Sequence, residues 1–317
     1  MTVTKLLRAF AKADKQTFLV GDSDAGVIVA LDLEGRWFAA LGGEVLNRVN
    51  LESVAGQSTQ ACYLNPGGDG LWPAPEGTTL GYQYATDAWR VPPGLCAARF
   101  RVIRATGRSV TIRAEVDLVN NRGVGIPALF ERRISVSPGR KSVTVRTVES
   151  ITYVGRTRLR RSECLLAPWS LCQFDCGPGC ETVFPCVKKR AVWDLYDEPS
   201  DGWQTWGDGM CRAQTDGSQC FQLGIGAEVP WIEFRDPRRG LTVRRTAGPL
   251  SPGCAYIDVR DVSPEIAPAR RGVRYSVYND KSGFMEMEAV GGCPAVLSPG
   301  ETLSVKIATR FAITKNN

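Results

Sequence analysis

The sequence predicts an all-β fold, a large antiparallel β-sandwich that residues 1–317 form as a single domain. Three observations predict it. Apolar and polar residues alternate with a period of two in most segments between turn signals. Glycine and proline are abundant, with 33 and 19 residues, which suits many short strands joined by tight turns. Helical periodicity is weak, whereas a fold of alternating strands and helices would need an amphipathic helix between most strands.

The strands are predicted from this alternation. In residues 109–118, Val110, Ile112 and Ala114 share one face with two further apolar residues, and charged or hydroxyl side chains occupy the other face. Residues 303–311 repeat the pattern near the C-terminus. The same reasoning predicts strands over residues 18–31, 96–104, 128–136, 142–153, 164–174, 231–234, 272–278 and 284–290.

Only residues 6–13 carry a weak helical period. Two long stretches rich in Gly, Pro and Trp, residues 65–93 and 175–219, are predicted to be irregular loops. Connections of that length within a domain are often functional, so these two loops are where we expect a site. We find no internal repeat and no linker that would mark a domain boundary.

The composition excludes several kinds of site. The chain contains no histidine, which rules out a Ser-His-Asp triad, a Cys-His pair and a His-ligated metal. The formal net charge is +6, but the basic residues are scattered, so we expect no nucleic-acid partner. The densest basic group is interpreted as a solvated strand edge or, alternatively, as an arginine cluster for an acidic sugar or phosphate; it comprises Arg156, Arg158, Arg160 and Arg161.

The N-terminal residues do not resemble a secretory signal, because basic residues interrupt the stretch before Asp22. No run approaches the roughly 18 apolar residues of a membrane span. We therefore expect no membrane partner and a cytoplasmic location. The oligomeric state is not predicted.

The eleven cysteines include a cluster in the second long loop. Four thiolates could hold zinc or an iron–sulfur cluster, but paired C-x₂-C spacing is absent, so free thiols are the favoured interpretation and we expect no cofactor. A metal-stabilised structural or interaction module without catalysis stays open as an alternative. The candidate ligands are Cys172, Cys176, Cys180 and Cys186.

Residues 65–76 read NPGGDGLWPAPE and are followed by Trp89 and the pair Pro92-Pro93. This stretch, together with APWSL at 167–171, WIEF at 231–234, YSVYN at 275–279 and GFMEME at 283–288, resembles an uncharacterised bacterial family of the galactose-mutarotase-like superfamily. The matches run in order from about residue 26 to residue 311. The resemblance implies a β-supersandwich whose concave face binds sugars, and so a carbohydrate ligand.

An indole offers a flat apolar face to a pyranose, and carboxylates, amides or hydroxyls can hydrogen-bond its hydroxyl groups. An alternative is that Trp72 and Trp169 only close the core. The expected ligand-binding residues are Asn65, Trp72, Glu76, Trp89, Trp169, Trp231 and Tyr278.

Glu286 and Glu288 are two residues apart on a predicted strand, so both should lie on one face. They either face solvent or lie in the concave site with raised pKa values. In mutarotases a late-strand Glu is the base that takes the anomeric hydroxyl proton, and the resemblance places Glu288 or Glu286 in that role. The partner acid there is His, so Asp69, Asp258 or Tyr278 would have to replace it.

We therefore expect a carbohydrate-binding protein with Glu288, Glu286 and Asp69 as candidate catalytic residues. If the chain is an enzyme, an isomerase of the aldose-epimerase kind acting at the anomeric centre is expected. A glycoside lyase or hydrolase using paired carboxylates is a further alternative.

Overall fold

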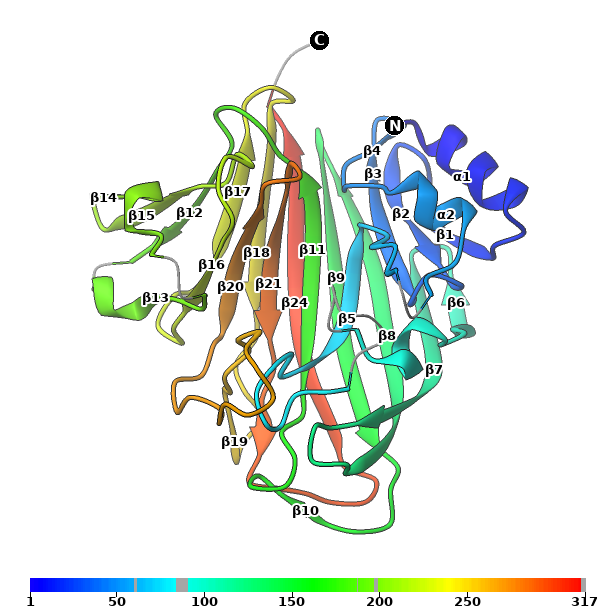
Figure 1. The fold of residues 1–317 in the computed structure, drawn as a ribbon. Coiled ribbons are helices and arrows are strands. Elements are labelled where there is room, and N and C mark those ends of the chain that lie inside the picture. The colour runs from blue at the N-terminus through cyan, green and yellow to red at the C-terminus, as the bar shows by residue number, and fades with distance from the viewer. Residues whose placement is uncertain (60–61, 84–90, 187, 197–198, 315–317) are drawn as a thin grey trace.

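The structure is a computed structural model and describes residues 1–59, 62–83, 91–186, 188–196 and 199–314. In these residues two ten-stranded antiparallel sheets pack face to face (Figure 1). The predicted all-β fold is confirmed.

The first sheet carries the site. Its order is β1-β2-β3-β5-β11-β21-β20-β16-β13, and β4 pairs with β3. The bounds are β1 (Thr17–Gly21), β2 (Ala25–Ala30), β3 (Arg36–Leu41), β4 (Glu44–Val45), β5 (Asp69–Ala74), β11 (Ala167–Asp175), β13 (Val192–Asp194), β16 (Phe221–Ile225), β20 (Tyr275–Asp280) and β21 (Phe284–Val290).

The second sheet has the order β14-β15-β12-β17-β18-β24-β9-β8-β7-β6. The bounds are β6 (Arg101–Thr106), β7 (Ser109–Val119), β8 (Gly125–Gly139), β9 (Ser142–Tyr153), β12 (Glu181–Pro185), β14 (Gln204–Gly207), β15 (Met210–Gln214), β17 (Ile232–Asp236), β18 (Leu241–Ala247) and β24 (Thr302–Ile313). Two short pairs complete the strands: β10 (Leu159–Arg160) with β23 (Val296–Leu297), and β19 (Cys254–Ala255) with β22 (Cys293–Pro294).

The main core lies between the two sheets. Aromatic contacts join them: Phe174 of β11 stacks on Phe234 of β17 with ring centroids 5.1 Å apart, and Trp37 of β3 meets Phe311 of β24 edge-on. In β7 and β9 buried and more accessible residues alternate, as expected for strands with one wet face. By contrast, every residue of β21 is buried, because the outer face of the first sheet is also covered there.

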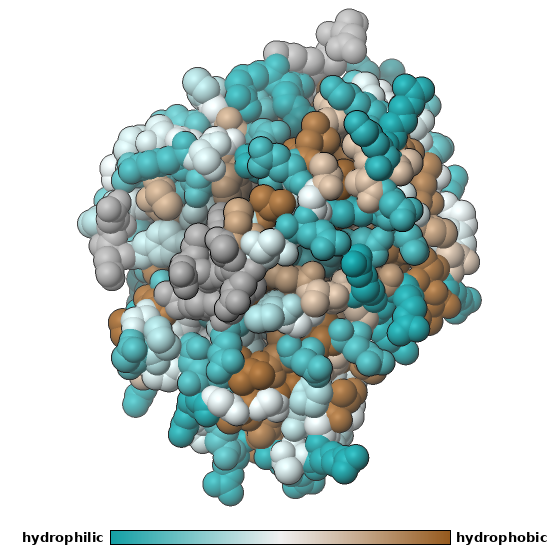
Figure 2. All heavy atoms as spheres, turned by 45° about the vertical axis from the view of Figure 1, so that its right-hand side comes forward, coloured by the Kyte–Doolittle hydropathy of each residue, from teal (hydrophilic) through white to brown (hydrophobic). Residues whose placement is uncertain are grey.

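The helices are few and short. They are α1 (Val3–Lys12), α2 (Leu51–Ala55) and α3 (Pro93–Cys96), with two 3₁₀ turns, η1 (Lys189–Ala191) and η2 (Asp201–Trp203). Thr2 caps α1, and Val3, Leu6 and Phe10 bury one side of that helix. Helices α1 and α2 lie outside strands β1 to β4 (Figure 1). On the face near them, hydrophilic residues are interspersed with hydrophobic ones (Figure 2). Among the described helices none could cross a membrane.

Several predicted elements need correction. Residues 65–93 contain β5 and end at the first residue of α3, and residues 175–219 contain four strands, β12 to β15, so neither stretch is one irregular loop. Glycine and proline interrupt the alternation of apolar and polar residues in these strands, so the local pattern does not predict them. Pairing with β11 sets the register of β5. The single strand predicted over residues 18–31 is a hairpin, since the Asp22 carboxylate accepts from the backbone N–H groups of Asp24 and Ala25 in the turn.

Candidate functional site

A cavity of about 280 Å³ lies on the outer face of the first sheet, over β11, β20 and β21. We call it the carboxylate cavity. The described residues that line it are Trp72, Glu76, Trp169, Leu171, Tyr196, Gln222, Asp261, Tyr278, Asp280, Glu286 and Glu288. It therefore brings together six of the residues expected to bind a sugar or act on it, from segments far apart in the chain: Trp72, Glu76, Trp169, Tyr278, Glu286 and Glu288.

Strand parity places the two glutamates in the cavity. Met285 and Met287 are fully buried in the core, so Glu286 and Glu288 lie on the opposite, outer face of β21. Glu288 lies opposite Leu171 of β11 and Ser276 of β20. Glu286 lies opposite Gln173 and Tyr278 in the same two strands. Of the two alternatives for this pair, the structure therefore shows the cavity and not solvent.

Neutral donors hold both carboxyl groups. The Trp169 Nε1–H donates to Glu288 Oε2 over 3.1 Å, and Gln222 Nε2 donates to both oxygens of Glu288 at 3.3 Å. Gln173 Nε2 donates to Glu286 Oε1 over 2.6 Å. Glu288 is 1% exposed and Glu286 is 4% exposed. Neutral hydrogen bonds fix the position of a carboxyl group without compensating the cost of burying its charge.

This environment raises both pKa values. Burial raises the pKa of Glu286 to about 7, and the nearby Arg36 guanidinium opposes that rise. Burial and the charge of Glu286 raise the pKa of Glu288 well above its usual range. The two groups titrate together, so near neutral pH the pair holds both a proton that it can donate and an oxygen that can accept one.

Two indoles form one wall of the cavity. Trp72 and Trp169 are opposite residues of β5 and β11 and meet edge to face, with ring centroids 6.4 Å apart. The Trp72 Nε1–H donates to Glu34 Oε2, and Glu34 also accepts from the Tyr63 hydroxyl over 2.7 Å. Arg36 completes this group with a 3.0 Å ion pair to Glu34. Both indoles are 4% exposed or less, so they close the core and line the cavity at once.

Tyrosines form the opposite wall. The Tyr278 hydroxyl donates to Asp280 Oδ2, and its ring meets Tyr196 edge-on at 6.1 Å. Burial raises the pKa of Tyr278 far above its usual value, so its hydroxyl stays protonated. Tyr278 therefore lies in the site as expected, with its own proton committed to Asp280.

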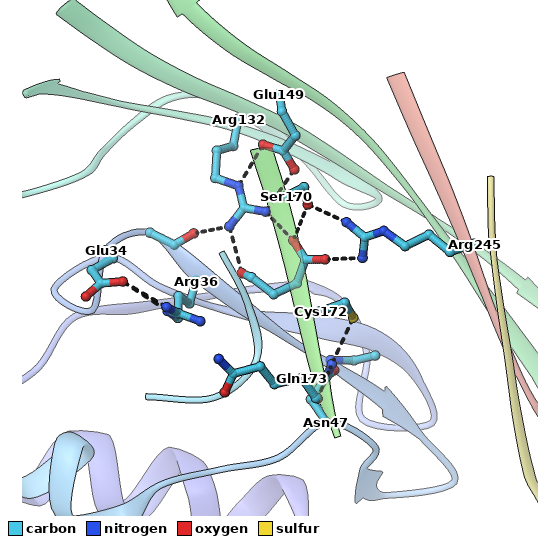
Figure 3. Close-up of polar contacts among 12 residues, drawn as sticks. Glu34, Arg36, Asn47, Arg132, Glu149, Ser170, Cys172, Gln173 and Arg245 are labelled. Carbon is cyan, nitrogen blue, oxygen red and sulfur yellow. Dashed lines mark hydrogen bonds and ion pairs between the residues drawn. The ribbon is translucent and has the colours of Figure 1, made fainter. Parts of the chain in front are cut away.

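Asp69 does not face this cavity. It lies between the two sheets, where its carboxylate forms ion pairs of 2.5 Å with Arg132 and 2.6 Å with Arg245. Ser170 also donates to it, and Arg132 is held in turn by Glu149 at 2.8 Å (Figure 3). All of these side chains are buried. Because the residue parity of β5 turns Asp69 inward and two guanidinium groups hold its charge, it is not placed to act as the partner acid.

Other expected residues also lie elsewhere. The Asn65 side chain accepts from the backbone N–H of Gly67, which shapes the loop before β5. Trp231 precedes β17 in the second sheet, where the Arg244 guanidinium stacks on it at 4.1 Å. Asp258 accepts from Arg260 Nε and from the backbone of Ala269. Trp89 falls outside the described residues.

Five residues at or beside the cavity were not predicted from the sequence: Gln173, Gln222, Tyr196, Asp261 and Asp280. Gln222 belongs to β16, which was not predicted as a strand because only five residues form it and Gly224 interrupts its alternation. Gln173 lies inside a predicted strand, and its spacing from Trp169 and Leu171 was the available signal.

The candidate cysteines of the second long loop are not gathered into one ligand set in the described structure. All eleven cysteines are described and are free thiols. Cys172 points to the inner side of β11 and accepts from Asn47 Nδ2 at 3.3 Å, whereas the Cys186 thiol donates to the backbone oxygen of Lys188. Burial raises the pKa of Cys176 to about 12 and that of Cys180 to about 11, which disfavours the thiolates a metal needs. In the described chain no group of three or more Cys, Asp or Glu residues is placed to hold a metal ion.

A larger cavity of about 570 Å³ lies near Glu34, lined among others by Lys15, Asp32, Cys96 and Arg99. Its charged groups are engaged with the protein: Arg99 pairs with Asp32 at 3.0 Å, and Lys15 donates to the backbone oxygens of Ser53 and Gly56. The carboxylate cavity is the better candidate because the buried Glu286 and Glu288 are hydrogen-bonded by neutral amide and indole groups and form no ion pair within the described part of the chain.

Solved structures define the class of fold. A galactose mutarotase-like protein from Lactobacillus casei aligns with a TM-score of 0.57 at 9% identity, covering 93% of this chain and 100% of its own. A galactose mutarotase-like protein from Clostridium acetobutylicum gives 0.56 at 9% identity, with 95% and 96% coverage. A galactose mutarotase related enzyme from Lactobacillus acidophilus gives 0.53 at 12% identity, with 95% and 99% coverage. The chain therefore has the galactose-mutarotase-like fold.

Residues 4–228 match a family of unknown function, DUF6786, and this protein belongs to that family. No curated protein sequence matches the chain. The resemblance to an uncharacterised galactose-mutarotase-like family is thus confirmed.

Proposed function

We propose that this protein binds a carbohydrate in the carboxylate cavity and exchanges protons at the anomeric centre of that sugar. The observation that carries the proposal is that two indoles and a proton-sharing glutamate pair face one cavity. Its volume of about 280 Å³ is at the small end of ligand cavities, which suits a single sugar ring. The mutarotase-like fold of the solved relatives agrees with a sugar ligand.

The glutamate pair can supply both an acid and a base without histidine. The ionised carboxylate accepts the proton of the anomeric hydroxyl while the protonated carboxyl donates one to the ring oxygen. The bond between the anomeric carbon and the ring oxygen then breaks as the carbonyl forms, and reclosure on the other face returns both protons. Both oxygens are attached to the same carbon, so two adjacent carboxyl groups on one strand face can reach them.

The same arrangement disfavours a glycoside hydrolase. Such enzymes place their two carboxyl groups on either side of the scissile bond. Glu286 and Glu288 instead lie two residues apart on the same face of one strand, and burial raises the pKa of both. The free cysteines likewise favour no metal-stabilised module.

The test is exchange between sugar anomers, followed by NMR magnetisation transfer, on a panel of aldoses. We expect exchange above the uncatalysed rate, and Glu288→Gln to reduce it by about 10²-fold or more because the remaining carboxyl group cannot act as acid and base at once. The matched control is Glu115→Gln, which changes an exposed glutamate on β7 and should keep the wild-type rate.

The exchange rate should pass through a maximum near pH 7, since one carboxyl group must be ionised and the other protonated. Full activity in Glu288→Gln, or no exchange with any aldose, would contradict the proposal.

A further inference from the structure

Four side chains that line the carboxylate cavity already use their hydrogen-bond donors within the protein. Trp169 and Gln222 donate to Glu288, Trp72 donates to Glu34, and Tyr278 donates to Asp280. A ligand that needs hydrogen bonds from the protein, as a carboxylate or phosphate group does, would have to break these contacts.

The amide oxygen of Gln222 is an acceptor in this lining. Gln222 is 3% exposed and lines the cavity, and its Oε1 has no hydrogen-bond partner in the described part of the chain. The amide is oriented with Nε2 toward Glu288, so Oε1 is the buried atom of this lining residue that is left without a donor in the described part of the chain. A buried acceptor without a partner is costly in the free protein and indicates a donor that arrives with the ligand.

The charge of the cavity also favours a cationic donor. No Lys or Arg is found among the described lining residues, whereas Asp280, Glu286 and Glu288 are carboxyl groups. The nearest guanidinium, Arg36, is paired with Glu34. An ammonium group carries three donors and a positive charge, so it would satisfy Gln222 Oε1 and compensate the buried carboxylates together.

From these contacts we propose that the cavity takes a 2-amino sugar, a hexose whose carbon next to the anomeric carbon bears an ammonium group. Gln222 touches Glu288, one of the two carboxyl groups proposed to exchange protons at the anomeric centre, so we expect its amide to lie near a ring position next to that centre. This inference rests on the proposed function and adds to it the chemical class of the substrate. It also predicts that sugar acids and sugar phosphates are excluded.

The experiment is isothermal titration calorimetry on the full chain with glucosamine, galactosamine and mannosamine. Each is compared with its parent hexose, with its N-acetyl derivative, which keeps an N–H but loses the charge, and with glucuronate and glucose 6-phosphate. We expect at least one hexosamine to bind about tenfold or more tightly than its neutral counterparts, because hydrogen bonds to charged groups are the stronger ones. Binding should release protons at pH 7, measured in buffers of different ionisation enthalpy, because the ammonium favours the ionised carboxyl groups.

Two variants locate the ammonium. Gln222→Met removes the open acceptor, so the ratio of hexosamine to hexose affinity should fall toward one. Gln222→Glu keeps acceptor oxygens at that position, so the preference should persist; it serves as the second measurement where the Met variant folds poorly. Equal or tighter binding of the hexose, or comparable binding of either anionic sugar, overturns this inference and leaves the proposed function standing. Failure of every sugar to bind overturns both.

Discussion

The raised pKa of Glu286 makes a prediction about stability that needs no ligand. Moving the pKa of a buried carboxyl from 4.5 to about 7 corresponds to roughly 3 kcal/mol between its two protonation states. Because the folded chain binds this proton more tightly than the unfolded chain, the contribution is complete below pH 4.5 and is lost as the pH rises through about 7. Glu286→Gln keeps the neutral form at every pH. The variant should therefore gain about 3 kcal/mol relative to wild type between about pH 5 and about pH 8.

The assay is urea unfolding followed by tryptophan fluorescence at those two pH values, since the chain has eight tryptophans. Glu115→Gln changes the same chemical group on an exposed strand face and should follow wild type at both. If Glu286→Gln and wild type lose stability in parallel as the pH rises, Glu286 does not hold a proton in the folded protein. The reasoning about the carboxyl pair would then be refuted.

Two further predictions concern the core. Asp69→Asn leaves Arg132 and Arg245 buried without the counter-charge that they share. In urea titrations the substitution should therefore lower the free energy of unfolding by about 3–5 kcal/mol. A loss below about 1 kcal/mol would contradict this role of Asp69. With Ellman's reagent, the exposed Cys62 should react fast in the native protein, while buried thiols such as Cys172 react only on unfolding; rapid native reaction of most of the eleven cysteines would contradict the core packing.

The sequence by itself determined the fold class, because period-two alternation is a local signal that survives without knowledge of the partner strand. It also placed Glu286 and Glu288 on one face, since parity within a strand follows from chain geometry alone. The absence of histidine by itself excludes the partner acid that mutarotases use.

Only the tertiary structure decided which face each strand presents to the cavity. Asp69 and Trp72 lie in one strand, yet packing turns the first toward two arginines between the sheets and the second toward the site. Gln222 reaches Glu288 because β16 pairs with β20, and β20 pairs with β21. The register of β16 on β20 depends on contacts between residues fifty or more positions apart, and local sequence patterns carry no information about it.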